Sequence, residues 1–167
     1  MQGLLRRAVR SLRTLPSAAA WRESALIGLV ALLLIGGLAG ASGLLRYEPR
    51  FDPLLLTVFF IPALTEELVF RGPLPERGET AQPAVWLAAG VLAFVLWHIV
   101  EALTFLPGAT LFLTPGFLLS ATVLGAACAV LRYRTGSLWP AVALHGVVVL
   151  FWQMLFGGPG AAELIQG

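Results

Sequence analysis

The chain is 167 residues long, and 58% of them are hydrophobic while only 12% are charged. Soluble globular domains carry about 25% charged residues, so this composition, with a mean hydropathy of +0.86, excludes an ordinary soluble domain and indicates a membrane protein. The net charge of +2 gives no support to nucleic-acid binding, and a single cysteine excludes a disulfide framework.

Residues 1–22 form an arginine-rich lead-in to the apolar part of the chain. Their stretch LLRRAVRSLRTL is typical of an amphipathic helix that lies on a membrane surface. Because arginine-rich flanks are retained in the cytoplasm, we expect a cytoplasmic N-terminus in a plasma (inner) membrane. A secretory signal cleaved after Ala41 is an alternative interpretation of the same start, and it would leave four spans.

Long uncharged runs mark the membrane-spanning segments. A helix needs about 20 apolar residues to cross the hydrocarbon core of a bilayer, which is about 30 Å thick. Runs of that order predict five spans, at about 23–45, 54–70, 84–100, 117–131 and 138–156. The predicted fold is therefore an all-α, polytopic transmembrane helix bundle. With the N-terminus inside, nine of the 11 arginines fall in cytoplasmic segments, among them Arg71.

Two local patterns refine these spans. Gly36 and Gly40 have the GxxxG spacing that is typical of closely packed membrane helices, so we expect close packing of the first span there. The apolar stretch 103–116 is interrupted twice by Pro-Gly, and we expect it to dip into the membrane as a re-entrant segment.

Strongly ionisable groups inside the spans are few, and they come from three different spans. They are Glu66, Glu67, His98 and His145. A charge at the bilayer centre costs roughly 3 kcal/mol on insertion scales, so such groups normally face a cavity and serve function. We expect the three spans to bring them into one site. Glu101, three residues after His98, either lies at the external interface or orients that histidine.

The spacing of the two glutamates gives them different partners. Glu67 and Arg71 are four residues apart on one helix face, so we expect an ion pair that keeps Glu67 charged. Glu66 is rotated by about 100° from Glu67 and has no local partner. Carboxylates in such different surroundings can serve as one structural charge and one general base. A neutral imidazole from another helix could help to hold a water against Glu66.

Three motifs resemble those of a known family. EELVFR matches Glu-Glu-x-x-x-Arg, FVLWH matches Phe-x-x-x-His at Phe94 and His98, and RTGSLWPAVALHG is similar to the stretch that leads to a last histidine, here His145. In this order, over about residues 54–150, they resemble the CAAX prenyl protease and bacteriocin-processing (CPBP) family of intramembrane, glutamic-type proteases.

The resemblance implies an intramembrane endopeptidase in which Glu66 activates a water, assisted by His98 and His145. The supporting residues that it implies are Glu67, Arg71 and Phe94. The implied substrate is a membrane-associated peptide or protein tail in the lipid bilayer, with no nucleic acid among the partners.

On this interpretation the chain has four parts. Residues 1–22 are the cytoplasmic segment, 23–52 the first transmembrane helix and its external turn, 53–157 the protease core, and 158–167 a short C-terminal tail.

We expect no metal cofactor. The family was once taken for zinc enzymes, and Glu66, His98 and His145 form a set that could bind zinc. However, the chain has no His-Glu-x-x-His helix and no other histidine to complete such a site.

One position departs from the family pattern. The family usually has Asn or Asp four residues after the last histidine, where it is thought to bind the developing oxyanion, whereas this chain has Val149. Loss of one such donor typically lowers the rate about 10²–10³-fold. Gln153 lies about 12 Å from His145 along a helix, which is too far for a simple substitute.

Two alternatives stay open. Val149 favours the first, a non-catalytic membrane protein that binds, scaffolds or confers immunity and that retains the polar cluster for structure. The second is a proton-coupled carrier, because buried Glu and His chains also relay protons. The sequence shows none of the two-fold repeats that carriers often have.

Depth poses a separate problem for the five-span arrangement. Glu66 and His145 are predicted near the inner face, whereas His98 falls late in its span. The three can meet only if the third span starts below the inner surface, tilts or is short.

Overall fold

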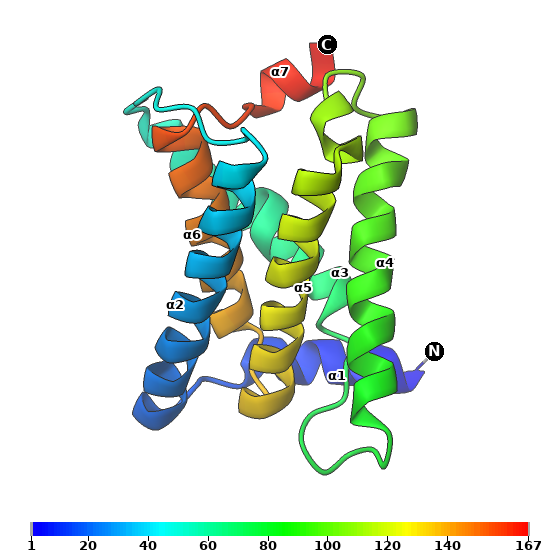
Figure 1. Cartoon of the computed structure of the whole chain (residues 1–167). Helices are drawn as coiled ribbons and strands as arrows, with labels where there is room; N and C mark the ends of the chain where they lie inside the picture. The colour runs from blue at the N-terminus through cyan, green and yellow to red at the C-terminus, as the bar shows by residue number, and fades with distance from the viewer. Residues whose placement is uncertain (1, 167) are drawn as a thin grey trace.

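The computed structural model describes residues 2–166, so Met1 and Gly167, at the outer ends of the two predicted terminal segments, lie outside the described residues. Within residues 2–166 the regular structure is helical, apart from an isolated bridge between Glu48 and Phe156. The long helices stand side by side as a bundle (Figure 1). This arrangement confirms the predicted all-α, polytopic fold.

The bundle contains four long helices. They are α2 (Ala18–Ala41), α4 (Pro83–Thr104), α5 (Pro115–Thr135) and α6 (Trp139–Leu155). In the described part of the chain, four segments are long and apolar enough to cross a membrane: α2, Pro53–Phe70, α4 and α5. The fifth predicted span, α6, has 17 residues and is therefore only about 25 Å long.

Helix α5 packs against α2, α4 and α6 and forms the centre of the bundle. Its buried Leu124 and Leu131 form one apolar cluster with Ala31 of α2 and Leu144 of α6. The predicted close packing at the GxxxG motif is wrong for residues 2–166: both glycines are exposed, no other helix lies within 4 Å of a Cβ built at Gly36, and one at Gly40 would meet only the side chain of Leu45, at 3.9 Å.

The predicted second span is not one straight helix. It consists of a 3-10 helix η1 (Pro53–Phe59), a π-helical turn η2 (Phe60–Leu64) and the short helix α3 (Thr65–Phe70). Ile61 has an extended backbone, with φ −132° and ψ 114°. The reason is Pro62, since a proline disfavours the helical conformation of the residue before it.

This broken segment resolves the predicted conflict of depths. Helix α3 lies at about half the height of the bundle, and the chain then descends to the lower end, where α4 begins (Figure 1). The two carboxylates on α3 therefore lie inside the bundle rather than at its lower end. Arg71, which the sequence places in a loop, caps the C-terminal end of α3 with its side chain fully buried.

The predicted amphipathic segment forms helix α1 (Gln2–Arg13), which lies across the lower end of the bundle (Figure 1). Its last turn is tied to the start of α6. The carbonyl of Ser11 accepts a hydrogen bond from the backbone N–H of Leu138, and the carbonyl of Leu12 accepts one from Nε1 of Trp139, both at 3.0 Å. Helix α1 is thus part of the packed structure.

Arginines of α1 also pair with the loop between α3 and α4. The Nε atom of Arg7 lies 3.2 Å from a carboxylate oxygen of Glu79, and Arg10 pairs with both Glu76 and Glu79. Burial alone would raise the pKa of Glu79, but the hydrogen bond from Arg10 and the nearby positive charges outweigh burial and lower that pKa.

The upper end of the bundle is closed by two short helices. The segment predicted to re-enter the membrane contains the 3-10 helix η3 (Thr110–Leu113), which places the ring of Phe112 5.5 Å from that of His98. The predicted C-terminal tail contains helix α7 (Ala161–Gln166). Its Glu163 pairs with Arg50 at 3.3 Å and so ties the tail to the segment that follows α2.

Candidate active site

Glu67 is the most enclosed carboxylate of the site. Its side chain is fully buried on α3, and its Oε1 lies 3.3 Å from Nη1 of Arg71 and 2.9 Å from Nδ1 of His145. The predicted Glu67–Arg71 ion pair is therefore present. The contact with His145 was not predicted, because the two residues are 78 positions apart and no local spacing relates them.

Arg71 lies over an aromatic ring in the core. Its guanidinium carbon is 4.0 Å from the ring centroid of Phe94 on α4, which is close enough for a cation–π interaction. A glycine on the facing helix α5 makes room for this contact, because a Cβ at Gly125 would lie 2.8 Å from Nη2 of Arg71.

Phe94 connects Arg71 with both histidines. Its ring is fully buried and makes edge-to-face contacts with His98, at a centroid distance of 4.6 Å, and with His145, at 5.8 Å. Such pairs are favourable in this geometry, so one phenyl ring fixes two imidazoles that arrive on different helices.

The hydrogen bond of His98 defines which of its ring nitrogens faces the site. Nδ1 lies 2.8 Å from the backbone carbonyl of Phe94, one helical turn earlier. A carbonyl only accepts, so Nδ1 carries the proton, and Nε2 of the neutral ring is an acceptor.

His145 is arranged in the same way by a different partner. Its Nδ1 donates to Glu67, which leaves Nε2 directed toward Glu66, 3.9 Å from Oε2. That Oε2 atom is buried, and it has no hydrogen-bond partner among residues 2–166. At 3.9 Å the two atoms are too far apart for a direct hydrogen bond, and a spacing beyond 3.5 Å suits a bridging water.

Glu101 lies close to Glu66 and His98 and is half-buried. One oxygen of Glu66, one oxygen of Glu101 and one ring nitrogen of His98 lie within 4.8 Å of one another. Among residues 2–166, these three side chains are the group that is close enough together to bind one cation. Carboxylate oxygens and imidazole nitrogens are zinc ligands. This set differs from the predicted zinc set, because Glu101 takes the place of His145.

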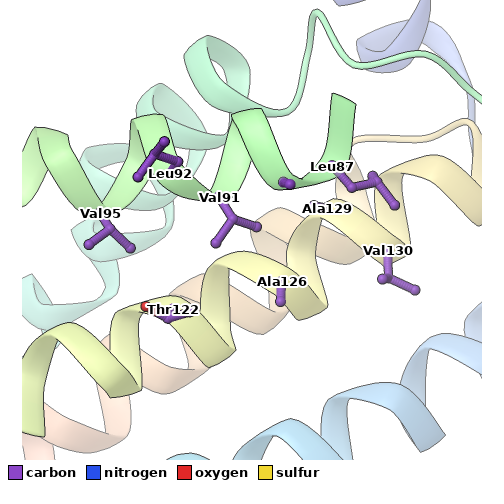
Figure 2. Close-up of a pocket in the computed structure, with 9 residues that line it drawn as sticks. Leu87, Val91, Leu92, Val95, Thr122, Ala126, Ala129 and Val130 are labelled. Carbon is purple, nitrogen blue, oxygen red and sulfur yellow. The ribbon is translucent and has the colours of Figure 1, made fainter. Parts of the chain in front are cut away.

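An apolar groove runs along the outside of the bundle, away from these residues. It lies between α4 and α5, has a volume of about 390 Å³, and is lined by Leu87, Val91, Val95, Thr122 and Val130, among others (Figure 2). None of its lining residues is ionisable. The groove and the polar site therefore use different faces of α4.

No side-chain hydrogen-bond donor stands at position 149, where the family usually has Asn or Asp. Val149 is half-buried on α6, one turn after His145. Gln153 does not replace it, because its side-chain nitrogen donates to the carbonyl of Pro159 at 2.9 Å.

A comparison with family models identifies the chain. Residues 49–151, well over half of the chain, match the family of the type II CAAX prenyl endopeptidase Rce1-like proteins. The chain belongs to this family. The match supports the resemblance found in the sequence, and it includes α3, α4, α5 and most of α6. The chain matches no curated protein and no solved structure at a significant level.

The family is one of membrane proteases that act on membrane-associated substrates. Several long apolar helices show that this member is a multi-pass membrane protein. Of the predicted site residues, the structure brings together Glu66, Glu67, Arg71, Phe94, His98 and His145. The sequence left open whether Glu101 lies at the external interface or orients His98, and it did not predict that Glu101 lies near Glu66. The available signal was the i, i+3 spacing between Glu101 and His98.

Proposed function

We propose that this chain is a glutamic-type intramembrane endopeptidase. Glu66 is the general base that removes a proton from a water, and Nε2 of His145 and Nε2 of His98 are the acceptors available to the second hydrogen of that water. The observation that carries this proposal is the convergence on one point of three polar groups from three segments, with Glu66 Oε2 3.9 Å from His145 Nε2. Positioned bases of this kind typically contribute about 10²–10⁴-fold to a rate.

Glu67, Arg71 and Phe94 hold this arrangement in place. The Glu67–His145 hydrogen bond of 2.9 Å orients the imidazole and fixes its tautomer. Arg71 neutralises the buried carboxylate of Glu67 at 3.3 Å. Phe94 keeps both imidazole rings at their angles.

The substrate is a peptide or protein tail at the membrane, and no metal takes part in the reaction. The protein resides in the plasma (inner) membrane with its N-terminus in the cytoplasm. Support comes from the arginines at the end of the bundle where α1, the α3–α4 loop and the α5–α6 turn lie, which include Arg6, Arg7, Arg10, Arg13, Arg77 and Arg134.

Cleavage can be tested without knowing the substrate in advance. Host membranes that contain the wild-type protein or Glu66→Gln are treated with an amine-reactive label, and new peptide termini are identified by mass spectrometry. In parallel, the purified protein in liposomes is given an internally quenched peptide that ends in a farnesylated CAAX sequence, and the same peptide without the lipid. We expect cleavage by the wild-type protein and by the control Glu163→Gln, and none by Glu66→Gln, His98→Ala or His145→Ala.

The same experiments contain the result that would refute the proposal. Identical termini in wild-type and Glu66→Gln membranes, together with two uncleaved peptides, would exclude a protease that uses Glu66. Zinc detected in the purified protein by elemental analysis, with activity lost to a chelator, would exclude the metal-free mechanism.

Val149 favours a second candidate function, a non-catalytic membrane-binding or scaffold protein. A valine in the place of the usual hydrogen-bond donor is tolerated in a protein that only binds. This candidate predicts that Glu66→Gln retains the biological effect of the wild-type protein in cells, whereas the protease predicts its loss.

A further inference from the structure

The ring donors of the two histidines are already used. The Nδ1 proton of His98 is committed to the carbonyl of Phe94, and that of His145 to Glu67. In a neutral ring Nε2 is then an acceptor, and an ionised Glu66 only accepts. Hydrolysis of a peptide bond passes through a state in which the carbonyl oxygen becomes negative and needs donors. The valine four residues after His145 cannot supply one.

Arg71 does not fill the gap. Its side chain is fully buried, it lies against the ring of Phe94 at 4.0 Å, and it pairs with Glu67 at 3.3 Å. These contacts hold the guanidinium beside Glu67, whereas the carboxyl of Glu66 is the one that is partly exposed.

Glu101 is close enough to the reacting groups to act on the same substrate atom. It follows His98 by three residues, so both side chains lie on one face of α4. Its carboxylate oxygen, an oxygen of Glu66 and a ring nitrogen of His98 lie within 4.8 Å of one another. Atoms that each bond to one shared oxygen at about 2.8 Å can be at most about 5.6 Å apart, so this spacing allows a common bonded oxygen.

The directions of the helices make Glu101 a counterpart of Val149. Helices α4 and α6 both start at the lower end of the bundle and rise to its upper end (Figure 1). Val149 stands one turn after His145 on α6, and Glu101 stands nearly one turn after His98 on α4. Both positions therefore lie above the histidine of their helix, and only the one on α4 is polar.

We propose that Glu101 is a catalytic residue of this chain, which donates from its carboxyl group the hydrogen bond to the developing oxyanion that Val149 cannot supply. This inference rests on the proposed protease function. Two carboxyl groups whose oxygens lie within 4.8 Å of each other can hold one proton between them, as the paired carboxyls of aspartic proteases do. Glu66 is then the ionised base and Glu101 the protonated donor.

The proton balance of the reaction closes with these two groups. Glu66 takes a proton from the water as the water oxygen bonds to the carbonyl carbon. The C–N bond then breaks, and the proton on Glu66 passes to the leaving amine. Glu101 keeps its own proton throughout and hydrogen-bonds the oxyanion while that charge exists.

The test compares kcat and KM for the quenched peptide that the wild-type protein cleaves fastest. We expect Glu101→Ala to lower kcat about 10²–10³-fold with little change in KM, which is the typical effect of losing one oxyanion donor. Glu101→Gln retains an N–H donor and should keep kcat within about 10-fold of wild type. Val149→Asn alone should change kcat little. The double variant Glu101→Ala/Val149→Asn should have a kcat at least about 10-fold higher than that of Glu101→Ala, since one oxyanion donor is worth about 10²–10³-fold in rate.

Several results would overturn the assignment. One is wild-type kcat in Glu101→Ala. Another is a loss in both Glu101 variants that Val149→Asn does not rescue, which would mean that Glu101 acts through structure or charge. A third is zinc that binds to the wild-type protein and not to Glu101→Ala, since Glu101 would then be a metal ligand. An active Glu66→Gln variant refutes the proposed function itself, so the two failures are distinguishable, and thermal unfolding of each variant identifies any that do not fold.

Discussion

Glu66 and Glu67 are neighbours on one short helix, yet they lie in opposite halves of the site. Glu67 is in the buried half, with no exposed side-chain surface, and it is bonded to His145 and paired with Arg71. Glu66 is in the open half, with 13% of its side chain exposed. Each carboxylate has one buried oxygen without a hydrogen-bond partner within residues 2–166, but only Glu67 is held through its other oxygen. A carboxylate with fixed partners supports structure, whereas one without them is available to a substrate.

The largest expected effect is on catalysis in the open half. Glu66→Gln removes the proposed base without removing a bonded partner, so kcat should fall about 10²–10⁴-fold. The free energy of unfolding, measured in detergent micelles, should stay close to the wild-type value. A strongly destabilised Glu66→Gln protein would show that both glutamates are structural, which would contradict the proposed difference between them.

The next effect is on stability in the buried half. Arg71→Ala leaves the carboxylate of Glu67 buried without its cation, which typically costs about 3–5 kcal/mol. Unfolding in micelles should therefore separate Arg71→Ala from Glu66→Gln by several kcal/mol. Equal stabilities for the two variants would contradict the division of the site into two halves.

A smaller effect should follow from crowding the buried half. In Gly125→Ala the added Cβ would lie 2.8 Å from Nη2 of Arg71 and 3.2 Å from the ring of Phe94. Overpacking of this kind typically costs about 1–3 kcal/mol. Gly36→Ala is the matched control, because no described atom approaches the new Cβ there. The measurement is the difference in unfolding free energy, and similar values for the two variants would count against tight packing around Arg71.

The smallest effect concerns the ion pairs of α1, which differ from the buried pair in being partly exposed. Glu79→Gln should cost only about 0.2–1 kcal/mol at pH 7. Because the pKa of Glu79 is lowered in the folded protein, its contribution is present above the pKa of the unfolded chain and is lost as the pH falls through the folded value. The difference between wild type and Glu79→Gln should thus begin to shrink near the unfolded pKa of about 4.3 and disappear at lower pH, once the carboxylate of the folded protein is protonated. A difference that grows in acid would show the opposite linkage.

Much of the bundle could be predicted from the sequence, because hydropathy over about 20 residues is a local property. The predicted spans at 84–100 and 117–131 lie inside α4 and α5, and 138–156 differs from α6 by one residue at each end. The break in the second span was harder to predict. Pro62 was visible, but an apolar run that contains a proline is also compatible with a kinked helix.

The candidate site was predicted in part, and the difference depends on sequence distance. The Glu67–Arg71 ion pair follows from i, i+4 spacing on one helix. The Glu67–His145 hydrogen bond depends on how α3 and α6 pack, and no local pattern encodes that packing. The neighbourhood of Glu101 depends on both, because its spacing from His98 is local and its approach to Glu66 is tertiary.

The hydrogen bonds between α1 and the start of α6 have a practical consequence for handling this protein. Trimming the first 13 residues would remove the acceptors of the Leu138 N–H and the Trp139 indole, at the base of the helix that bears His145. A shortened version that looks inactive could therefore have lost the alignment of a distant imidazole rather than a membrane anchor, and purification handles on this protein are better kept away from α1.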